Sequence, residues 1–181
     1  MNVEYEMSIF AKWICVAAAL LVAAPAFAQS PPSPHPCTAS THVFCVTNTS
    51  DDNTATGPAG SLRRAISDSN TNGGANTIDF DIVGTGPFTI TLVAQLPAIN
   101  ADGNLTSLLI DGYSQAGSAV NTNAPDQGGL NGALAIELVG AGFDGLFYYC
   151  CPFPKIDLTF QGLALRGFYV PIAGQSNGLT Q

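Results

Sequence analysis

The stretch Phe80-Asp81-Ile82-Val83-Gly84 introduces a pattern that returns as LLIDG at 108–112, IELVG at 136–140 and LALRG at 163–167. The closing glycines are separated by 28, 28 and 27 residues, and large apolar side chains stand four and two positions before each glycine. Alternate residues of a strand share one face, so stacking the repeats would align these side chains in two ladders. The closing glycine would let the chain turn a corner with a positive φ.

A strand signature at this spacing is typical of a solenoid, because a single repeat cannot bury its apolar face alone. Each ladder side chain that is buried contributes about 1.5–3 kcal/mol. An antiparallel sandwich, the alternative, also has alternating strands but needs no constant register. The sequence therefore predicts an all-β parallel β-helix, in which residues 89–92 and 145–148 form other faces of the rungs.

A different pattern precedes the rungs. Residues 42–48 have the β-branched and aromatic content of a strand, and residues 49–60 are rich in turn formers. Ser61 then provides an N-cap for a short amphipathic helix with Leu62, Ala65 and Ile66 on one face. We expect residues 42–75 to form an N-terminal cap with a capping helix and residues 76–181 to form the rungs.

The N-terminus has the features of a secretory signal. Lys12 supplies a positive flank, residues 14–24 are continuously apolar, and Ala26-Phe27-Ala28 is an A-x-A cleavage site. The apolar run is shorter than the roughly 20 residues needed to cross a bilayer. We expect residues 1–28 to be a signal peptide, residues 29–41 to be a Pro/Ser-rich leader, and the protein to be exported to the cell surface, the medium or the periplasm, with no transmembrane segment in the mature chain.

Charge excludes one class of partner. The formal net charge is −8 from 13 acidic and 5 basic residues, and removal of residues 1–28 takes away two acidic residues and one basic residue, leaving about −7. A nucleic-acid partner needs clustered Lys and Arg to displace counterions, and the mature chain would keep only Arg63, Arg64, Lys155 and Arg166. We therefore expect no nucleic-acid binding.

Four cysteines lie in the mature part, Cys37, Cys45, Cys150 and Cys151, and export makes disulfides expected. Cys37 with Cys45 is the easiest local pair. An alternative is a metal site, because His35 and His42 interleave with these two cysteines, although the spacing fits no ordinary zinc pattern.

Several segments together resemble the CSLREA-domain family, which consists of bacterial secreted or surface proteins. The resemblance covers about residues 42–181 and is carried by VTNT at 46–49, GSLRRAI at 60–66, NTIDF at 76–80, IDGYSQ at 110–115 and IEL at 136–138. Gly60 stands where the family motif has Cys, and Arg64 where it has Glu. The resemblance implies a right-handed parallel β-helix of the pectin-lyase-like type, and it transfers no catalytic residues.

Carboxylates supply the candidate chemistry. Asp79 and Asp81 are two residues apart on one strand, so they point to one face about 7 Å apart, a separation that suits Ca²⁺ with added ligands or an acid/base pair. Glu137 falls in the same column as Asp81 two repeats later, which extends the candidate metal site into an acidic stripe. The alternative is a solvated outer face. No nucleotide-binding, zincin or α/β-hydrolase motif is present, and we expect no other cofactor.

These observations favour a non-enzymatic adhesin or surface stalk, a reading that rests on analogy with other exported β-helices. Its partners would be glycans or molecules of a host or cell surface, and the complete protein would be monomeric. The first alternative is a polysaccharide lyase or glycoside hydrolase that uses the Asp79 and Asp81 pair. The second is a truncated gene product without function, since residues 176–181 read as the start of another strand and the chain is expected to be the first part of a longer solenoid.

Overall fold

The computed structural model describes residues 36–100, 103–126, 128–150 and 156–176. The predicted signal peptide, most of the leader, His35, Cys151 and the strand expected at 177–181 lie outside these residues. The described elements are β1 (Val43–Val46), α1 (Leu62–Asn72), β2 (Gly74–Phe80), β3 (Phe88–Thr91), β4 (Leu105–Asp111), the 3₁₀ turn η1 (Gly112–Ser114), β5 (Ile136–Val139), β6 (Leu146–Cys150), β7 (Asp157–Gln161), β8 (Leu163–Arg166) and β9 (Ile172–Ser176).

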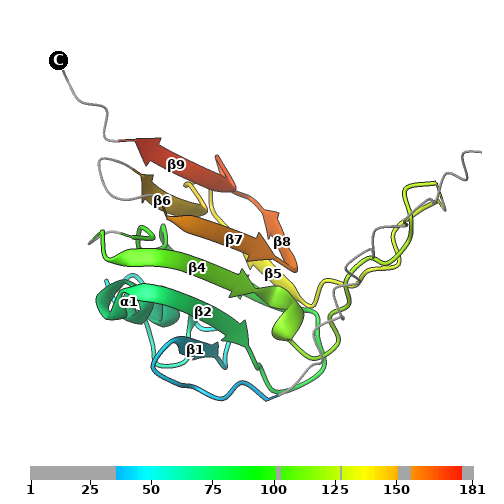
Figure 1. Ribbon diagram of the computed structural model, residues 1–181, viewed down its shortest axis with the longest axis horizontal. Helices are drawn as coiled ribbons and strands as arrows, with labels where there is room; N and C mark the ends of the chain where they lie inside the picture. The colour runs from blue at the N-terminus through cyan, green and yellow to red at the C-terminus, as the bar shows by residue number, and fades with distance from the viewer. Residues whose placement is uncertain (1–35, 101–102, 127, 151–155, 177–181) are drawn as a thin grey trace, which may run out of the picture.

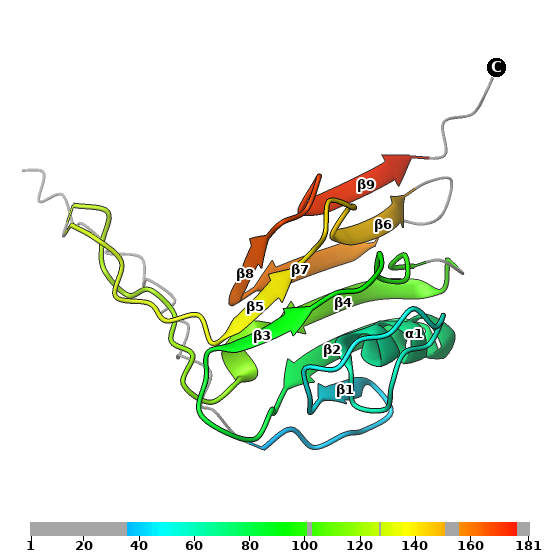
Figure 2. The ribbon, with the colours of Figure 1, turned by 180° about the vertical axis from the view of Figure 1, so that it is seen from behind.

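The strands form three sheets, and the ladders between the named strands are all parallel. Sheet A has the order β1-β2-β4-β7, sheet B has β3-β5-β8 and sheet C has β6-β9. Along the chain, the strands enter the sheets in a repeated order, so β4, β5, β6 and then β7, β8, β9 lie in sheets A, B and C in turn. Figures 1 and 2 show these turns of chain layered above one another. The fold is all-β with parallel sheets, and the antiparallel sandwich is wrong.

Inward side chains stack from one turn of chain to the next. In sheet A, Ile78 is in register with Ile110, and Ile110 with Phe160. Sheet B contains two such rows, Phe88 with Ile136 and Leu163, and Ile90 with Leu138 and Leu165. The members of the middle turn are fully buried. Burial of these rows, which removes apolar surface from water, is the main force that holds the turns together.

The register differs from the constant 28-residue repeat. That repeat placed Ile82 beside Ile110, whereas Ile110 pairs with Ile78 and Ile82 follows the end of β2. It also placed Ile110 beside Leu138, but these two residues belong to different sheets. Only its last step is correct, because Leu138 pairs with Leu165, 27 residues later. In sheet A the spacing is 32 residues from 78 to 110 and then 50 from 110 to 160.

The four repeat glycines do not share one role. Gly84 and Gly167 have positive φ values of 130° and 74°, as predicted for corners, whereas Gly112 and Gly140 do not have a positive φ. Gly112 is required for close approach instead, since a Cβ at this position would lie 2.6 Å from the carbonyl carbon of Gly162 in the next turn of chain. The corner after β4 therefore packs backbone against backbone.

The helix α1 packs beside β1 and β2, at the lower end of the stack in Figure 2. Ser61 caps it by accepting a hydrogen bond from the backbone N–H of Arg64 at 3.1 Å. Leu62, Ala65 and Ile66 are buried in the same core as the strand rows. The helix thus covers the apolar end of the stack next to its first strand, which is the position expected of a cap.

Arg63 ties this cap to the strands. Its guanidinium binds both carboxylate oxygens of Asp51, at 2.7 and 3.0 Å, and donates to the carbonyls of Ala94 and Gln95 at 2.8 Å each. The side chains of Arg63 and Asp51 are only 4% and 1% exposed. Asp51 also accepts the N–H of Val93 at 2.9 Å. A charged pair this deeply buried is tolerated because every polar contact is made.

Side chains after β4 extend sheet A where its strands end. The Gln115 Oε1 accepts the N–H of Ile82 at 2.8 Å, and the Gln115 Nε2 donates to the Ile82 carbonyl at 3.1 Å. Ser114 Oγ accepts the N–H of Phe80 at 2.7 Å. Gln115 and Ser114 are 1% and 8% exposed, so these bonds satisfy buried backbone groups that have no strand partner.

We expect Gln115→Ala to destabilise the fold by about 2 kcal/mol, because it leaves a buried N–H and a buried C=O of Ile82 unpaired. Urea unfolding followed by circular dichroism measures the loss. The matched control is Gln95→Ala, at an exposed position, which should change the free energy of unfolding by less than about 0.5 kcal/mol. Equal effects of the two substitutions would contradict the role given to Gln115.

Residues 116–134 form an arm that leaves the stack between η1 and β5 (Figure 1). Its two legs are joined by an antiparallel bridge between Ala119 and Ala133. Farther out, Asn121 Oδ1 accepts the N–H of Asn131, and Asn131 Oδ1 accepts the N–H of Thr122. The arm accounts for the long spacing between β4 and β7, and the sequence reasoning missed it.

Candidate functional site

Asp79 and Asp81, the predicted carboxylate pair, lie on the outward side of β2 and at its end. Asp79 is in register with Cys45 of β1, and Asp81 Oδ2 accepts the N–H of Cys37 at 3.1 Å. Cys37 and Cys45 form a disulfide, with their Cα atoms 5.8 Å apart. The carboxylates therefore stand beside the disulfide-linked segment before β1, and Asp81 holds its backbone in place.

The alternative metal site around these cysteines does not form in the described residues. The sulfurs of Cys37 and Cys45 are bonded to each other, so neither is a thiolate ligand. His42 Nδ1 lies 2.9 Å from Asn76 Oδ1. Among the residues whose positions are described, no three His, Cys, Asp or Glu side chains gather as a metal site requires.

Glu137 does not belong to the acidic stripe predicted with Asp79 and Asp81. It lies in β5 of sheet B, whereas those two carboxylates belong to the sheet A side, so the column drawn from the 28-residue repeat is wrong. Glu137 instead accepts hydrogen bonds from the guanidinium of Arg166 and, at 3.0 Å, from the hydroxyl of Thr89. This is a cross-strand polar cluster on the outer face of sheet B.

The Arg166 guanidinium, and to a smaller degree the Thr89 hydroxyl, hold the pKa of Glu137 below its ordinary value. A depressed folded-state pKa means that the cluster stabilises the fold above the unfolded-state pKa and loses this effect as pH falls through the folded-state pKa. We expect Arg166→Ala to raise the pKa of Glu137 toward its ordinary value, and Thr89→Val to raise it less. Carboxyl ¹³C shifts followed against pH measure both, and a pKa of Glu137 unchanged in Arg166→Ala would contradict this.

The remaining acidic turn serves the loop before α1. Asp52 Oδ1 accepts the N–H and the hydroxyl of Thr54, at 2.9 and 2.6 Å. The Thr54 hydroxyl, followed by its N–H, lowers the pKa of Asp52. Because neighbouring Asp51 binds Arg63, these two carboxylates order the turn and the cap.

A shallow groove on the outer face of sheet A brings together polar side chains that the sequence reasoning did not single out. It crosses β2, β4 and β7, has a volume of about 230 Å³, and is lined by the outward residues Ala75, Thr77, Ser107, Leu109, Asp157 and Thr159 together with the backbone of Asn76 and Leu108. Thr77, Leu109 and Thr159 form one row in register, and Ser107 and Asp157 belong to the next row. We call this feature the sheet A groove.

The sheet A groove has the chemistry of a binding surface for an uncharged polar polymer. Neighbouring strands lie about 4.8 Å apart, so the Thr77, Leu109 and Thr159 row spans roughly 10 Å. Hydroxyls at its two ends donate and accept hydrogen bonds, while Leu109 offers an apolar surface between them. The period of two within strands could have revealed the row, but only with the register between strands, which the constant repeat gave incorrectly.

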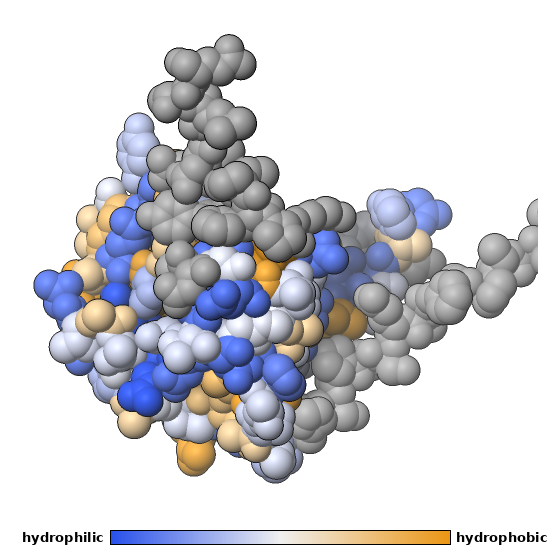
Figure 3. Space-filling model, turned by 60° about the vertical axis from the view of Figure 1, so that its left-hand side comes forward, coloured by the Kyte–Doolittle hydropathy of each residue, from blue (hydrophilic) through white to orange (hydrophobic). Residues whose placement is uncertain are grey.

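The outer surface has no large single patch of one character. In the view of Figure 3, hydrophilic and hydrophobic residues are interspersed over the face toward the viewer. No helix in the described ranges is long and apolar enough to cross a membrane. No protein-family model, curated protein or solved structure matches this chain.

Proposed function

We propose that the chain is the capped first section of a right-handed parallel β-helix that is exported and has a structural and adhesive role. The observation that carries the proposal is the repeated order in which strands enter sheets A, B and C. The α1 cap at one end, the disulfide between Cys37 and Cys45, and the resemblance to the CSLREA-domain family support it. The secretory signal in residues 1–28 assigns the protein to the surface, the medium or the periplasm.

Adhesion uses the sheet A groove, and its ligand class is a neutral glycan. Sugars present hydroxyls and apolar ring faces, which match the alternation of Thr77, Leu109 and Thr159. Asp157 at the groove and the net charge of −8 disfavour acidic polymers, because like charges repel. The rigid strands hold the row in place, so no ordering of the protein opposes binding.

The test is binding of the purified, exported chain to a panel of neutral and uronic-acid polysaccharides by affinity electrophoresis. We expect retardation by neutral polymers and about tenfold weaker binding for Thr77→Val with Thr159→Val, since each hydroxyl supplies a hydrogen bond. Thr91→Val, on the exposed outer face of sheet B, is the matched control and should bind normally. Retardation by none of the neutral polymers would overturn the proposal.

The lyase alternative gives a different readout in the same panel. Cleavage by β-elimination leaves an unsaturated end that absorbs ultraviolet light, and we expect none with uronic-acid polymers and Ca²⁺. Asp81 already accepts the N–H of Cys37, which favours a structural role for this carboxylate. Turnover that Asp81→Ala abolished would replace the adhesive proposal with the enzymatic one.

The stack continues beyond β7, β8 and β9 in the complete protein. Phe160, Leu163 and Leu165 continue the buried rows, yet they are only half-buried, and Ile172 is 44% exposed. A further turn of chain would bury them as the earlier rows are buried. Amide hydrogen exchange tests this, since β7–β9 should be better protected in the full gene product than in residues 1–181 alone. Equal protection would favour the alternative of a truncated, non-functional product.

A further inference from the structure

The arm of residues 116–134 differs from the rest of the surface in its charge. Residues 112–135 contain a single charged side chain, Asp126, in a chain whose formal net charge is −8. Nearly all of the arm is exposed, including Leu130 at 84% and Leu134 at 47%. An exposed projection of neutral residues with large apolar side chains is typical of an interaction surface.

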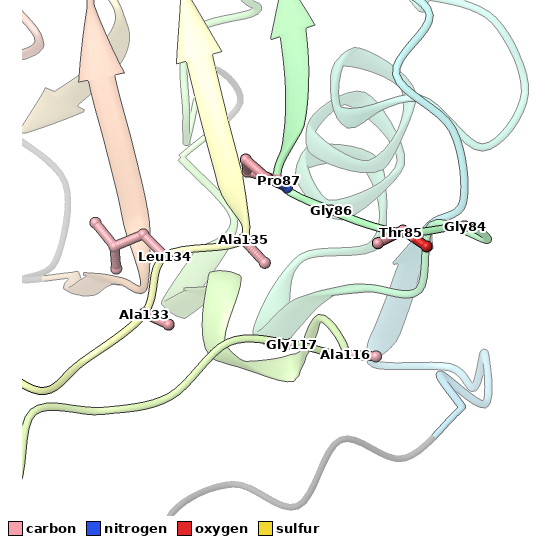
Figure 4. A pocket seen from close by; sticks show the side chains of 9 residues that line it. All are labelled: Gly84, Thr85, Gly86, Pro87, Ala116, Gly117, Ala133, Leu134 and Ala135. Atoms are coloured by element: carbon pink, nitrogen blue, oxygen red, sulfur yellow. The ribbon is translucent and has the colours of Figure 1, made fainter.

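A pocket lies at the base of the same arm. It has a volume of about 430 Å³ and is bounded by the corner after β2 on one side and by the two legs of the arm on the other, with the lining Gly84, Thr85, Gly86, Pro87, Ala116, Gly117, Ala133, Leu134 and Ala135. Figure 4 shows how small these side chains are. The pocket contains no charged side chain, and its only hydroxyl is that of Thr85.

We infer that the arm and this pocket form a self-complementary interface with a second copy of the chain. A two-fold axis would lay the two arms antiparallel, so that each outer arm lies against the base and pocket of the other copy. Such a contact is isologous, because the same patch is used twice and the assembly closes at two subunits. Each leg from Ala119 to Pro125 spans roughly 20 Å, which is long enough to reach across the partner's arm to its base.

Charge identifies the second copy as the occupant. Two chains of net charge −8 repel each other over most of their surfaces, and the arm with its pocket is an extended region where this repulsion is nearly absent. Small residues at the base, Ala116, Gly117 and Ala133, allow two backbones to approach closely. A lone two-legged hairpin is marginally stable in water, and pairing with a second arm relieves this weakness.

Sedimentation velocity of the exported full chain at several concentrations tests the interface. We expect a dimer, and we expect Leu130→Asp to weaken it at least about 30-fold, because two new carboxylates would be buried in each dimer. Leu130 is 84% exposed in the single chain, so the substitution leaves folding intact, which circular dichroism checks. Tyr169→Asp, at an 82% exposed site away from the arm, is the matched control and should leave the dimer unchanged.

A mixed sample of ¹³C-labelled and unlabelled chains locates the contact. Intermolecular NOEs from the methyl groups of Leu130 or Leu134 to the other copy's arm and pocket residues are expected. A chain that stays monomeric at high concentration would overturn the inference. Dimers that resist Leu130→Asp but dissociate with Ile172→Asp would also overturn it, since they would associate through the open end of the stack. Glycan binding by monomers would leave the adhesive proposal standing in either case.

Discussion

Arg63→Ala is expected to reduce the free energy of unfolding by about 3–5 kcal/mol. The substitution removes four hydrogen bonds and leaves the carboxylate of Asp51, with a side chain 1% exposed, without its counter-charge. It also separates α1 from the carbonyls of Ala94 and Gln95. Urea unfolding measured by circular dichroism and by tryptophan-independent amide exchange would report the loss.

The adjacent residue provides a matched control. Arg64 binds Asp68 on the outside of the same helix, and these side chains are 46% and 42% exposed. Exposed pairs of this kind contribute less than about 1 kcal/mol, so Arg64→Ala should have a small effect. If Arg63→Ala cost no more than Arg64→Ala, the buried pair would not hold the cap.

Arg63→Lys refines the test. A lysine ammonium cannot reproduce the planar fork that reaches two carboxylate oxygens and two carbonyls, so we expect most of the stability to be lost. Removing both charges, as Arg63→Met with Asp51→Asn, should cost less than the sum of the two single substitutions. Additive effects would show that the pair is not coupled.

Gly112→Ala is expected to have the second large effect, about 3 kcal/mol or more. The new Cβ would lie 2.6 Å from the carbonyl carbon of Gly162 and even closer to its oxygen, and backbone atoms cannot rotate away as a side chain can. β4 and β7 would have to separate at the corner. Amide exchange should therefore accelerate in β7 as well as at the site of substitution.

Gly142→Ala separates this steric effect from a conformational one. Gly142 has a φ of 85° and open space where a Cβ would be, whereas Gly112 has no positive φ. We expect a cost of roughly 1–2 kcal/mol from the backbone conformation alone, with β7 still protected. A smaller loss in Gly112→Ala than in Gly142→Ala would contradict the packing described between the two turns of chain.

The local elements could be predicted from the sequence. The N-cap Ser61, the apolar face of α1 and the strands around residues 89–92 and 145–148 depend on neighbouring residues, so a short window contains their signals. The parallel arrangement also follows from repetition.

The register could not be predicted. Strands of sheets A and B carry the same apolar-x-apolar signature, and an alignment on glycines merged them, joining Ile110 to Leu138. The arm of residues 116–134 then lengthened one turn of chain enough to restore an apparent spacing of 28. The false acidic column of Asp81 and Glu137 followed from this error.

The buried ion pair was missed for a physical reason as well. An arginine in the first turn of an amphipathic helix is usually solvated, and nothing local marks Asp51 as its partner. The resemblance contained the relevant residues, since its Ser-Leu-Arg segment includes Arg63 and its Tyr-Ser-Gln segment includes Ser114 and Gln115. Their buried hydrogen bonds became visible only in three dimensions.

The most direct test of the account is the register of the stacked strands, measured by NOEs between methyl and backbone protons in the exported chain. The structure requires contacts of Ile78 with Ile110 and of Leu138 with Leu165, in sheets A and B. Observation of both pairs, with no contact between Ile110 and Leu138, is the expected result. Contacts of Ile82 with Ile110 and of Ile110 with Leu138, or antiparallel patterns between these strands, would contradict it.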